Sequence, residues 1–155
     1  MPLHETLNLT DLPASTWRTS VTIRFGHCDP AGIVYTPNYF DIFNGLIEDW
    51  YSEALHLSYS SIIRDRRIGL GYAHASADFL STSRMGDVLR VAVVVKAIGR
   101  SSLTLSVHAF NGEPECVRAT FVSVTTSLET HRPVLIPDDI RAAIERYRDG
   151  TLRGH

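Results

Sequence analysis

Several stretches of the chain alternate hydrophobic and polar residues with a period of two, which is the pattern of half-buried β-strands. The pattern predicts strands over residues 19–25, 69–79, 88–98, 102–111 and 115–126. Short turn segments separate the last three of them, and Asn111-Gly112 is a strong hairpin signal. Because strands joined by tight hairpins must run antiparallel, we expect an antiparallel sheet.

The hydrophobic period changes to that of a helix after Thr36-Pro37. Threonine suits the N-cap of a helix, and proline suits its first position. The apolar residues that then share one side at helical spacing are Tyr39, Phe43, Leu46, Ile47, Trp50 and Ala54. The spacing predicts a helix from residue 36 to about residue 57, roughly 30 Å long. Shorter helices are expected over 58–66 and 137–149.

The expected order is therefore one strand, a long helix and four further strands. A helix this long and this apolar on one side must cover a face of the sheet, so we predict an α+β fold. An antiparallel sheet of about five strands wrapped around one long helix is the hotdog arrangement. The chain has 155 residues, enough for one domain. We divide it into an N-terminal arm (1–17), a single domain (18–150) and a C-terminal tail (151–155).

Charge and composition exclude several classes of function. The chain carries 15 lysines and arginines against 17 aspartates and glutamates, so no basic excess exists to neutralise phosphates and nucleic-acid binding is not expected. No run approaches 18 apolar residues, and residues 1–17 lack a secretory signal pattern, so we expect no membrane association. Cys28 and Cys116 make no disulfide framework, and we expect a cytoplasmic protein.

The most unusual stretch is the loop of residues 26–35, GHCDPAGIVY, which carries His27, Cys28 and Asp29 together. It leads to the start of the long helix, where free N–H groups and the helix dipole stabilise negative charge. A carboxylate beside donors aimed at a developing oxyanion is what acyl transfer needs. On the residues alone, Asp29-Pro30 also fits an ordinary turn pair, and Cys28 fits a small buried filler better than a nucleophile.

The segment FGHCDPAGIVYTPNY, residues 25–39, resembles the signature of the 4-hydroxybenzoyl-CoA thioesterase family of hotdog acyl-CoA thioesterases, whose usual form is close to FGDCDPAGIVxYPNY. The resemblance continues weakly over about residues 20–127. It implies hydrolysis of an aromatic or short-to-medium acyl-CoA, with CoA as part of the substrate and no separate cofactor. The family's catalytic carboxylate falls on Asp29, and the backbone N–H that polarises the thioester carbonyl falls on Thr36.

Further site residues follow from the same resemblance. Loop residues after the third strand contact CoA in such enzymes, and the matching positions are Arg100, Ser101 and Ser102. The chain departs from the family in two places. His27 replaces the first acidic residue of the signature, and Asn44 stands where the 4-hydroxybenzoyl enzyme has an aspartate facing the substrate phenol. We expect His27, Tyr35 and Asn44 to contact the substrate, and the family's mechanism to carry over more fully than its particular substrate.

Three alternatives stay open at this point. Asp29 either attacks the carbonyl to form an anhydride or activates a water molecule. His27 paired with Asp29 would also suit a hydratase or dehydratase acting on a thioester. A non-catalytic acyl-CoA-binding module would bind without turnover. A metal site is not expected, because no two of the seven histidines have helical or zinc-finger ligand spacing.

Unpaired sheet edges are a liability that proteins cover. Hotdog domains pair edge to edge into a continuous sheet, and the active sites of the family lie between subunits. The resemblance therefore implies a homo-oligomer, a dimer at least and a tetramer as the final state.

Overall fold

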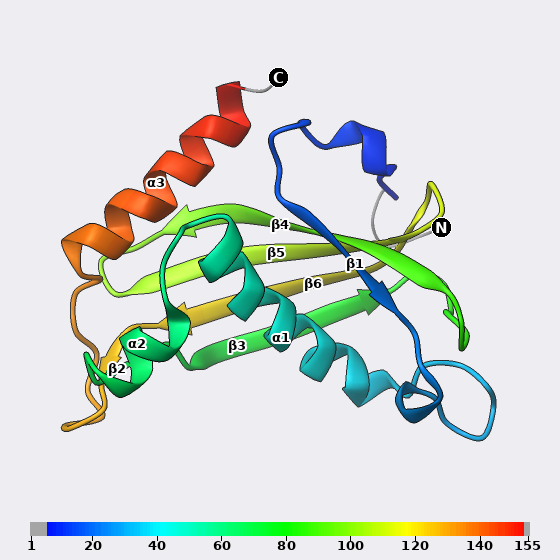
Figure 1. Ribbon diagram of the computed structural model, residues 1–155, viewed down its shortest axis with the longest axis horizontal. Helices are drawn as coiled ribbons and strands as arrows, with labels where there is room; N and C mark the ends of the chain where they lie inside the picture. Colours follow the sequence, from blue (N-terminus) through cyan, green and yellow to red (C-terminus); the bar gives the residue numbers. More distant parts are fainter. Residues whose placement is uncertain (1–5, 154–155) are drawn as a thin grey trace.

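A five-stranded antiparallel sheet curves around one long helix in the computed structural model, which describes residues 6–153 (Figure 1). The sheet has the order β1-β4-β5-β6-β3. Its strands are β1 (Arg18–Thr22), β3 (Tyr72–Phe79), β4 (Val88–Ile98), β5 (Ser102–Asn111) and β6 (Glu115–Val124). A small second sheet pairs β2 (Ile68–Gly69) with β7 (Thr126–Ser127). The α+β hotdog prediction is confirmed.

The helices are α1 (Thr36–Glu53), α2 (Tyr59–Arg64) and α3 (Asp138–Arg153), with short 3-10 helices η1 (Leu9–Asp11) and η2 (Phe25–His27). Of the expected arm and tail, residues 1–5 and 154–155 lie outside the described part. Within that part, no helix is both long and apolar enough to cross a membrane.

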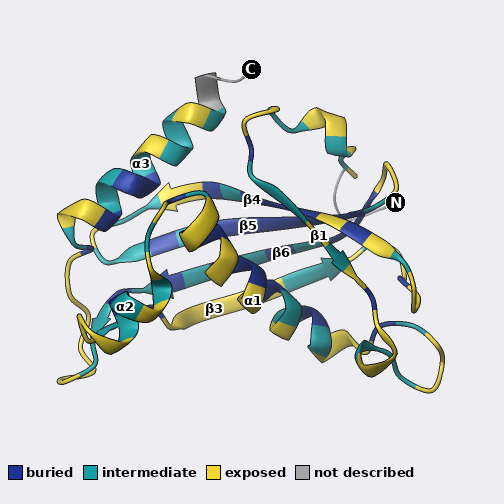
Figure 2. Ribbon diagram, in the orientation of Figure 1, coloured by how far each residue is buried: buried dark blue, intermediate teal, exposed yellow. Residues whose placement is uncertain are grey.

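The core lies between α1 and one face of the sheet (Figure 2). The buried residues of α1 are Tyr39, Phe43, Leu46, Ile47, Trp50 and Tyr51. They meet the alternate residues predicted to face inward, and Val91, Val93 and Val107 have no exposed surface at all. Burying one such side chain contributes about 1.5–3 kcal/mol relative to leaving it in water. The period-two pattern therefore identified the correct face of β4 and β5.

Element ends differ from the predictions where local turns take over. The first strand ends at Thr22 rather than residue 25, because the chain turns into η2 and leaves Phe25 83% exposed. Helix α1 ends at Glu53 rather than near Leu57, because His56 adopts a left-handed backbone with φ 58°.

Three further elements also differ. The expected strand over 69–79 begins only at Tyr72, because Gly69 belongs to β2, which pairs with β7. The expected strand over 115–126 splits into β6 and β7 on either side of Thr125. Helix α3 continues to Arg153, past its expected end at residue 149.

A buried polar cluster lies on the face of the sheet that α1 does not cover, on β5 and β6. His108 Nδ1 donates to Glu115 Oε2 (2.6 Å), and a hydrogen bond joins the Ser106 hydroxyl to His108 Nε2 (2.8 Å). Arg118 Nε donates to the same carboxylate (3.0 Å). The Glu115 side chain has no exposed surface. Because every charged member has a partner, the cluster satisfies a carboxylate that would otherwise be costly to bury.

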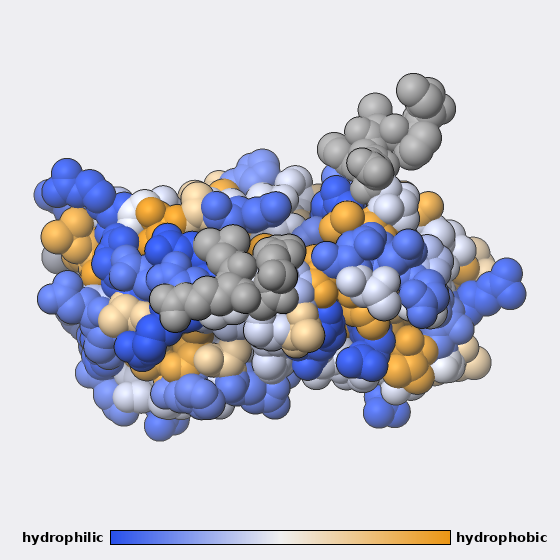
Figure 3. Space-filling model, turned by 90° about the horizontal axis from the view of Figure 1, so that it is seen from above, coloured by the Kyte–Doolittle hydropathy of each residue, from blue (hydrophilic) through white to orange (hydrophobic). Residues whose placement is uncertain are grey.

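The N-terminal segment is tied down at several points. The Glu115 N–H donates to the carbonyl of Leu7 (3.0 Å), beside the hairpin between β5 and β6. Near the start of β1, Tyr147 on α3 accepts from the Trp17 N–H (3.1 Å). Seen from above, the surface over these elements is mostly hydrophilic, with hydrophobic residues in separate small areas (Figure 3). The described part of this face therefore offers no broad apolar patch.

Candidate active site

The loop between η2 and α1 is held by its own backbone. The Asp29 N–H donates to the Ile33 carbonyl (2.9 Å), and the Gly32 N–H donates back to the Asp29 carbonyl (2.9 Å). Gly32 has φ 81°, a conformation that glycine adopts without strain. Cys28 and Val34 form an antiparallel bridge at the base. These bonds make a closed loop with Asp29 near its tip.

The Asp29 carboxylate is fixed but only partly engaged. Its Oδ1 accepts from the Ala31 N–H (2.8 Å), the turn geometry that aspartate favours. Its Oδ2 accepts no hydrogen bond in the described part of the chain, so one oxygen is available to a substrate or water. Asp29 lines a cavity of about 550 Å³ together with Phe25, Cys28, Pro30 and Met85, among others. The cavity is mostly apolar and holds one carboxylate, so a substrate can meet that carboxylate here.

Helix α1 begins beside this loop. The N-cap is Tyr35 and not Thr36 as predicted, and it makes no side-chain cap; Thr36 is the first helical residue and Pro37 the second. Tyr35 donates its N–H to the carbonyl of His27 (2.9 Å), and Asn38 donates its side-chain N–H to the same oxygen (2.9 Å). The Thr36 N–H has no acceptor among the described residues, and Pro37 has no N–H. Thr36 therefore leaves an open donor at the positive end of the helix.

His27 is committed to the backbone. Its Nδ1 accepts from the Arg24 N–H (2.9 Å), so the neutral ring carries its proton on Nε2. The lone pair that a general base needs is already used. His27 thus has the geometry of a residue that positions Arg24 and, through its carbonyl, the start of α1.

Tyr35, beside the loop, and Asn44, further along α1, are both exposed. Asn44 accepts a hydrogen bond from the Tyr72 hydroxyl (2.9 Å). Tyr72 escapes prediction because strict alternation along 69–79 places Ala73 toward the helix. A β-bulge between Tyr72 and His74 changes the register, and the Tyr72 ring packs on Phe121 although the residue stays 36% exposed. The only sequence feature that marks Tyr72 is its size, because it is a large residue at the start of a strand of mostly small ones.

Arg100, Ser101 and Ser102 do not lie near Asp29 in this chain. They lie at the turn into β5, while the loop contacts the segment before the other end of β4, where the Val34 N–H donates to the Ser83 carbonyl (3.0 Å). The eleven residues of β4 between the two ends span about 33 Å as extended strand. Figure 1 shows the turn and the loop at opposite ends of the sheet. The carbonyls of Arg100 and Ser101 accept from Ile136 and Thr125 (2.9 and 2.7 Å), which fixes the turn.

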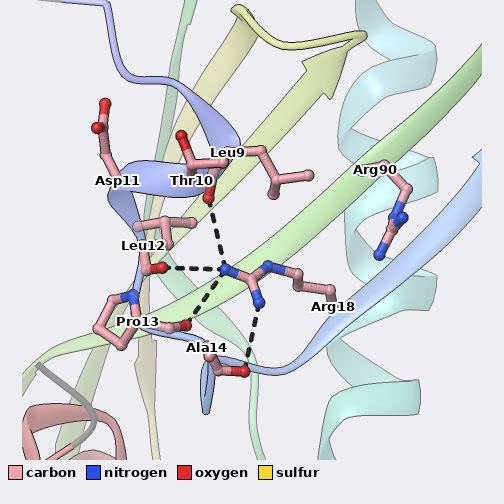
Figure 4. Close-up of a pocket in the computed structure, with 8 residues that line it drawn as sticks. All are labelled: Leu9, Thr10, Asp11, Leu12, Pro13, Ala14, Arg18 and Arg90. Carbon is pink, nitrogen blue, oxygen red and sulfur yellow. Dashed lines mark hydrogen bonds between the residues drawn. The ribbon is translucent and has the colours of Figure 1, made fainter.

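Another cavity, of about 560 Å³, lies under the N-terminal segment, away from the loop. It is lined by Arg18 and Arg90 and by residues 9–14 (Figure 4). The guanidinium of Arg18 donates to four backbone carbonyls, those of Leu9, Leu12, Pro13 and Ala14. Arg18 therefore anchors the segment to β1. In residues 6–153, no group of three histidine, cysteine or acidic side chains is arranged to hold a metal.

Comparison with known proteins identifies the family. A 1,4-dihydroxy-2-naphthoyl-CoA hydrolase from Nostoc punctiforme is 25% identical over 130 residues, covering 82% of this chain and 85% of that enzyme. A 4-hydroxybenzoyl-CoA thioesterase from Pseudomonas sp. strain CBS-3 is 31% identical over 81 residues, covering 52% of this chain and 57% of that enzyme.

The fold agrees with a solved structure. A Staphylococcus aureus protein in complex with CoA superimposes with a TM-score of 0.81 at 17% identity, covering 88% of this chain and 85% of that one. Residues 23–144, which include the loop and the whole of α1, match the thioesterase-like superfamily. The chain belongs to that superfamily and is a thioester hydrolase with the hotdog fold.

Proposed function

We propose that the chain hydrolyses acyl-CoA thioesters at the Asp29 loop. The observation that carries the proposal is the pairing of a half-free carboxylate on Asp29 with an open N–H on Thr36, joined by one backbone-bonded loop. The two relatives named above act on CoA thioesters, and the family signature spans both groups. The thioester carbonyl would accept from the Thr36 N–H while negative charge develops on its oxygen.

Two routes use the same groups. In one, Asp29 takes a proton from water as the water oxygen bonds to the carbonyl carbon, and the C–S bond then breaks to release CoA thiolate. In the other, the Asp29 oxygen itself bonds to the carbon, CoA thiolate leaves, and water hydrolyses the resulting anhydride. Unlabelled product acid after hydrolysis in ¹⁸O-labelled water under single-turnover conditions would identify the anhydride route, because only that route can place oxygen from Asp29 in the product.

A thiol-release assay over a panel of aromatic and short-to-medium acyl-CoAs tests the function itself. Steady production of free CoA thiol is the expected result. Tight binding without thiol release would identify a binding module, and water addition across a double bond without thiol release would identify a hydratase. A hydratase would need His27 as its base, but His27 Nδ1 already accepts a hydrogen bond from the Arg24 N–H.

The acyl specificity is expected to differ from that of an enzyme with an acid in the middle of α1. Asn44 carries no charge and cannot take a proton from a phenol. We therefore predict that 4-hydroxybenzoyl-CoA gains less than about 100-fold over benzoyl-CoA in kcat/KM, a difference of roughly 2.7 kcal/mol. Parallel steady-state kinetics with the two substrates check this, and a larger preference would contradict it.

We also propose that two chains pair through β3. This strand is a free edge of eight residues, mostly exposed and without lysine or proline to block pairing. A two-fold axis perpendicular to the sheet at β3 would exchange the ends of the two sheets. The partner's Arg100 would then lie at the same end of the dimer as Asp29, which explains why the two are separated within one chain. CoA would contact Arg100, Ser101 and Ser102 there.

Light scattering coupled to gel filtration checks the assembly. Because one chain has a mass of 17.3 kDa, we expect two or four times that mass at micromolar concentration, with the tetramer as the final state. Amide hydrogens on the open edge of β3 should also exchange slowly with solvent. A monomer with rapidly exchanging β3 amides would overturn the proposal.

A further inference from the structure

The side of α1 that faces β3 carries a row of residues leading away from Thr36. Thr36, Phe40 and Asn44 are spaced by four, so they are neighbours along one side of the helix. The Phe40 ring meets Phe121 edge-on at 6.2 Å between centroids. An acyl group whose carbonyl lies at Thr36 would pass over Phe40 and reach Asn44, about 12 Å further along the helix axis.

Tyr72 closes the far end of this row. Its ring packs on Phe121 with 5.0 Å between centroids, and its hydroxyl reaches Asn44 on the helix. The space behind it, between α1 and the sheet, has a volume of only about 10 Å³, room for one water at most. An acyl group therefore cannot enter the core behind Tyr72, and it must end against the Asn44–Tyr72 pair.

The hydrogen bond gives this pair a definite polarity. The Tyr72 hydroxyl donates to Asn44 Oδ1 (2.9 Å), so the amide oxygen is turned toward Tyr72 and one of its two lone pairs is used. Burial raises the pKa of Tyr72 well above its usual range, so the hydroxyl keeps its proton. The Asn44 Nδ2 has no acceptor among the described residues. Two N–H donors are thus left facing outward.

We propose that Asn44 and Tyr72 form a hydrogen-bond-donating end of the acyl site, one that selects acyl groups carrying an acceptor oxygen remote from the thioester. This rests on the proposed function and names Tyr72 as a specificity residue. Tyr72 acts through Asn44: it holds the amide in the orientation that presents nitrogen and not oxygen. A group with no acceptor there would leave the amide N–H atoms unpaired, which costs binding energy.

The test compares 4-acetylbenzoyl-CoA with 4-isopropylbenzoyl-CoA, which have similar shapes but differ in the ketone oxygen. The readout is the ratio of their kcat/KM values in each variant, so the intrinsic reactivity of each thioester cancels between variants. Asn44→Leu should lower the ratio about tenfold, the scale of one hydrogen bond. Tyr72→Phe should lower it about threefold, because the freed amide can then present either end. Ser52→Leu, at an exposed position of α1, should leave the ratio unchanged.

Non-hydrolysable thioether analogues of the two substrates give a second readout, the ratio of their Kd values. If the chain cleaves neither thioester but its Kd ratio still depends on Asn44, the proposed function fails and the selectivity stands. If turnover is normal and neither ratio responds to Asn44→Leu, the selectivity proposal is overturned. The selectivity proposal is also overturned if neither analogue binds.

Discussion

Asp29→Asn is expected to lower kcat at least about 1,000-fold, some 4 kcal/mol in the transition state. Asparagine keeps the shape of the residue, and its side-chain oxygen can still accept from the Ala31 N–H that fixes the turn. The substitution therefore removes the charge and leaves the loop intact. Affinity for CoA thioesters should be nearly unchanged, measured by calorimetry with a slowly hydrolysed substrate.

Two further variants sharpen this result. Asp41→Asn removes another carboxylate, exposed on α1 away from the loop, and should leave kcat unaltered. His27→Ala should reduce kcat by no more than about 30-fold, since its ring accepts only from the Arg24 N–H and alanine keeps the carbonyl that holds the start of α1. If Asp29→Asn retained over a tenth of wild-type turnover while His27→Ala abolished it, the roles would be reversed and a hydratase-like site would be favoured.

Glu115→Ala is expected to lower the free energy of unfolding by about 3–5 kcal/mol, the usual effect of removing one partner from a buried ion pair. It would remove one carboxylate partner of Arg118 and leave His108 without the acceptor for Nδ1. Urea unfolding followed by fluorescence measures the change. Glu113→Ala is the matched control, because that residue is exposed two positions away and should cost within about 0.5 kcal/mol.

The same carboxylate makes stability depend on pH. Burial raises the pKa of Glu115, but hydrogen bonds from His108 and Arg118 outweigh it and lower the pKa to about 2. Because the folded value is below the unfolded value of 4.5, the stabilisation is complete above pH 4.5 and is lost as the pH falls toward 2. The loss amounts to about 3 kcal/mol. Glu115→Gln should flatten this part of the profile; an unchanged slope would show that other groups control acid unfolding.

Sequence patterns predicted those parts of the fold in which one local rule decides the structure. The strand over 88–98 agrees with β4 at both ends, because a valine-rich alternation leaves a single register with the apolar side inward. The prediction that the first strand extends to Phe25 was wrong. The hydrophobicity of Phe25 continues the strand pattern, but backbone bonds in η2 turn the residue outward. The contact of Tyr72 with α1 was not predicted, because a β-bulge resets the alternation. A bulge depends on how β3 pairs with β6.

The candidate site divides in the same way. Asp29 and Thr36 lie within one short loop and helix start, so a local motif could place both. The Asn44–Tyr72 contact joins residues 28 positions apart, and no short motif reports it. Arg100 lies even further from Asp29, and a single chain does not bring them together.

The closed loop between His27 and Thr36 has an implication for how such a protein can diverge. The Asp29 carboxylate and the Thr36 N–H, the two groups proposed to act on the thioester, are tied by neighbouring backbone bonds, so their relative placement does not depend on side chains elsewhere in the sheet. Asn44 and Tyr72 lie outside this loop, on α1 and β3. Selection could therefore exchange the residues that recognise the acyl group while the reacting groups keep their geometry. New substrates would then arise by changing two side chains, with the chemistry inherited whole.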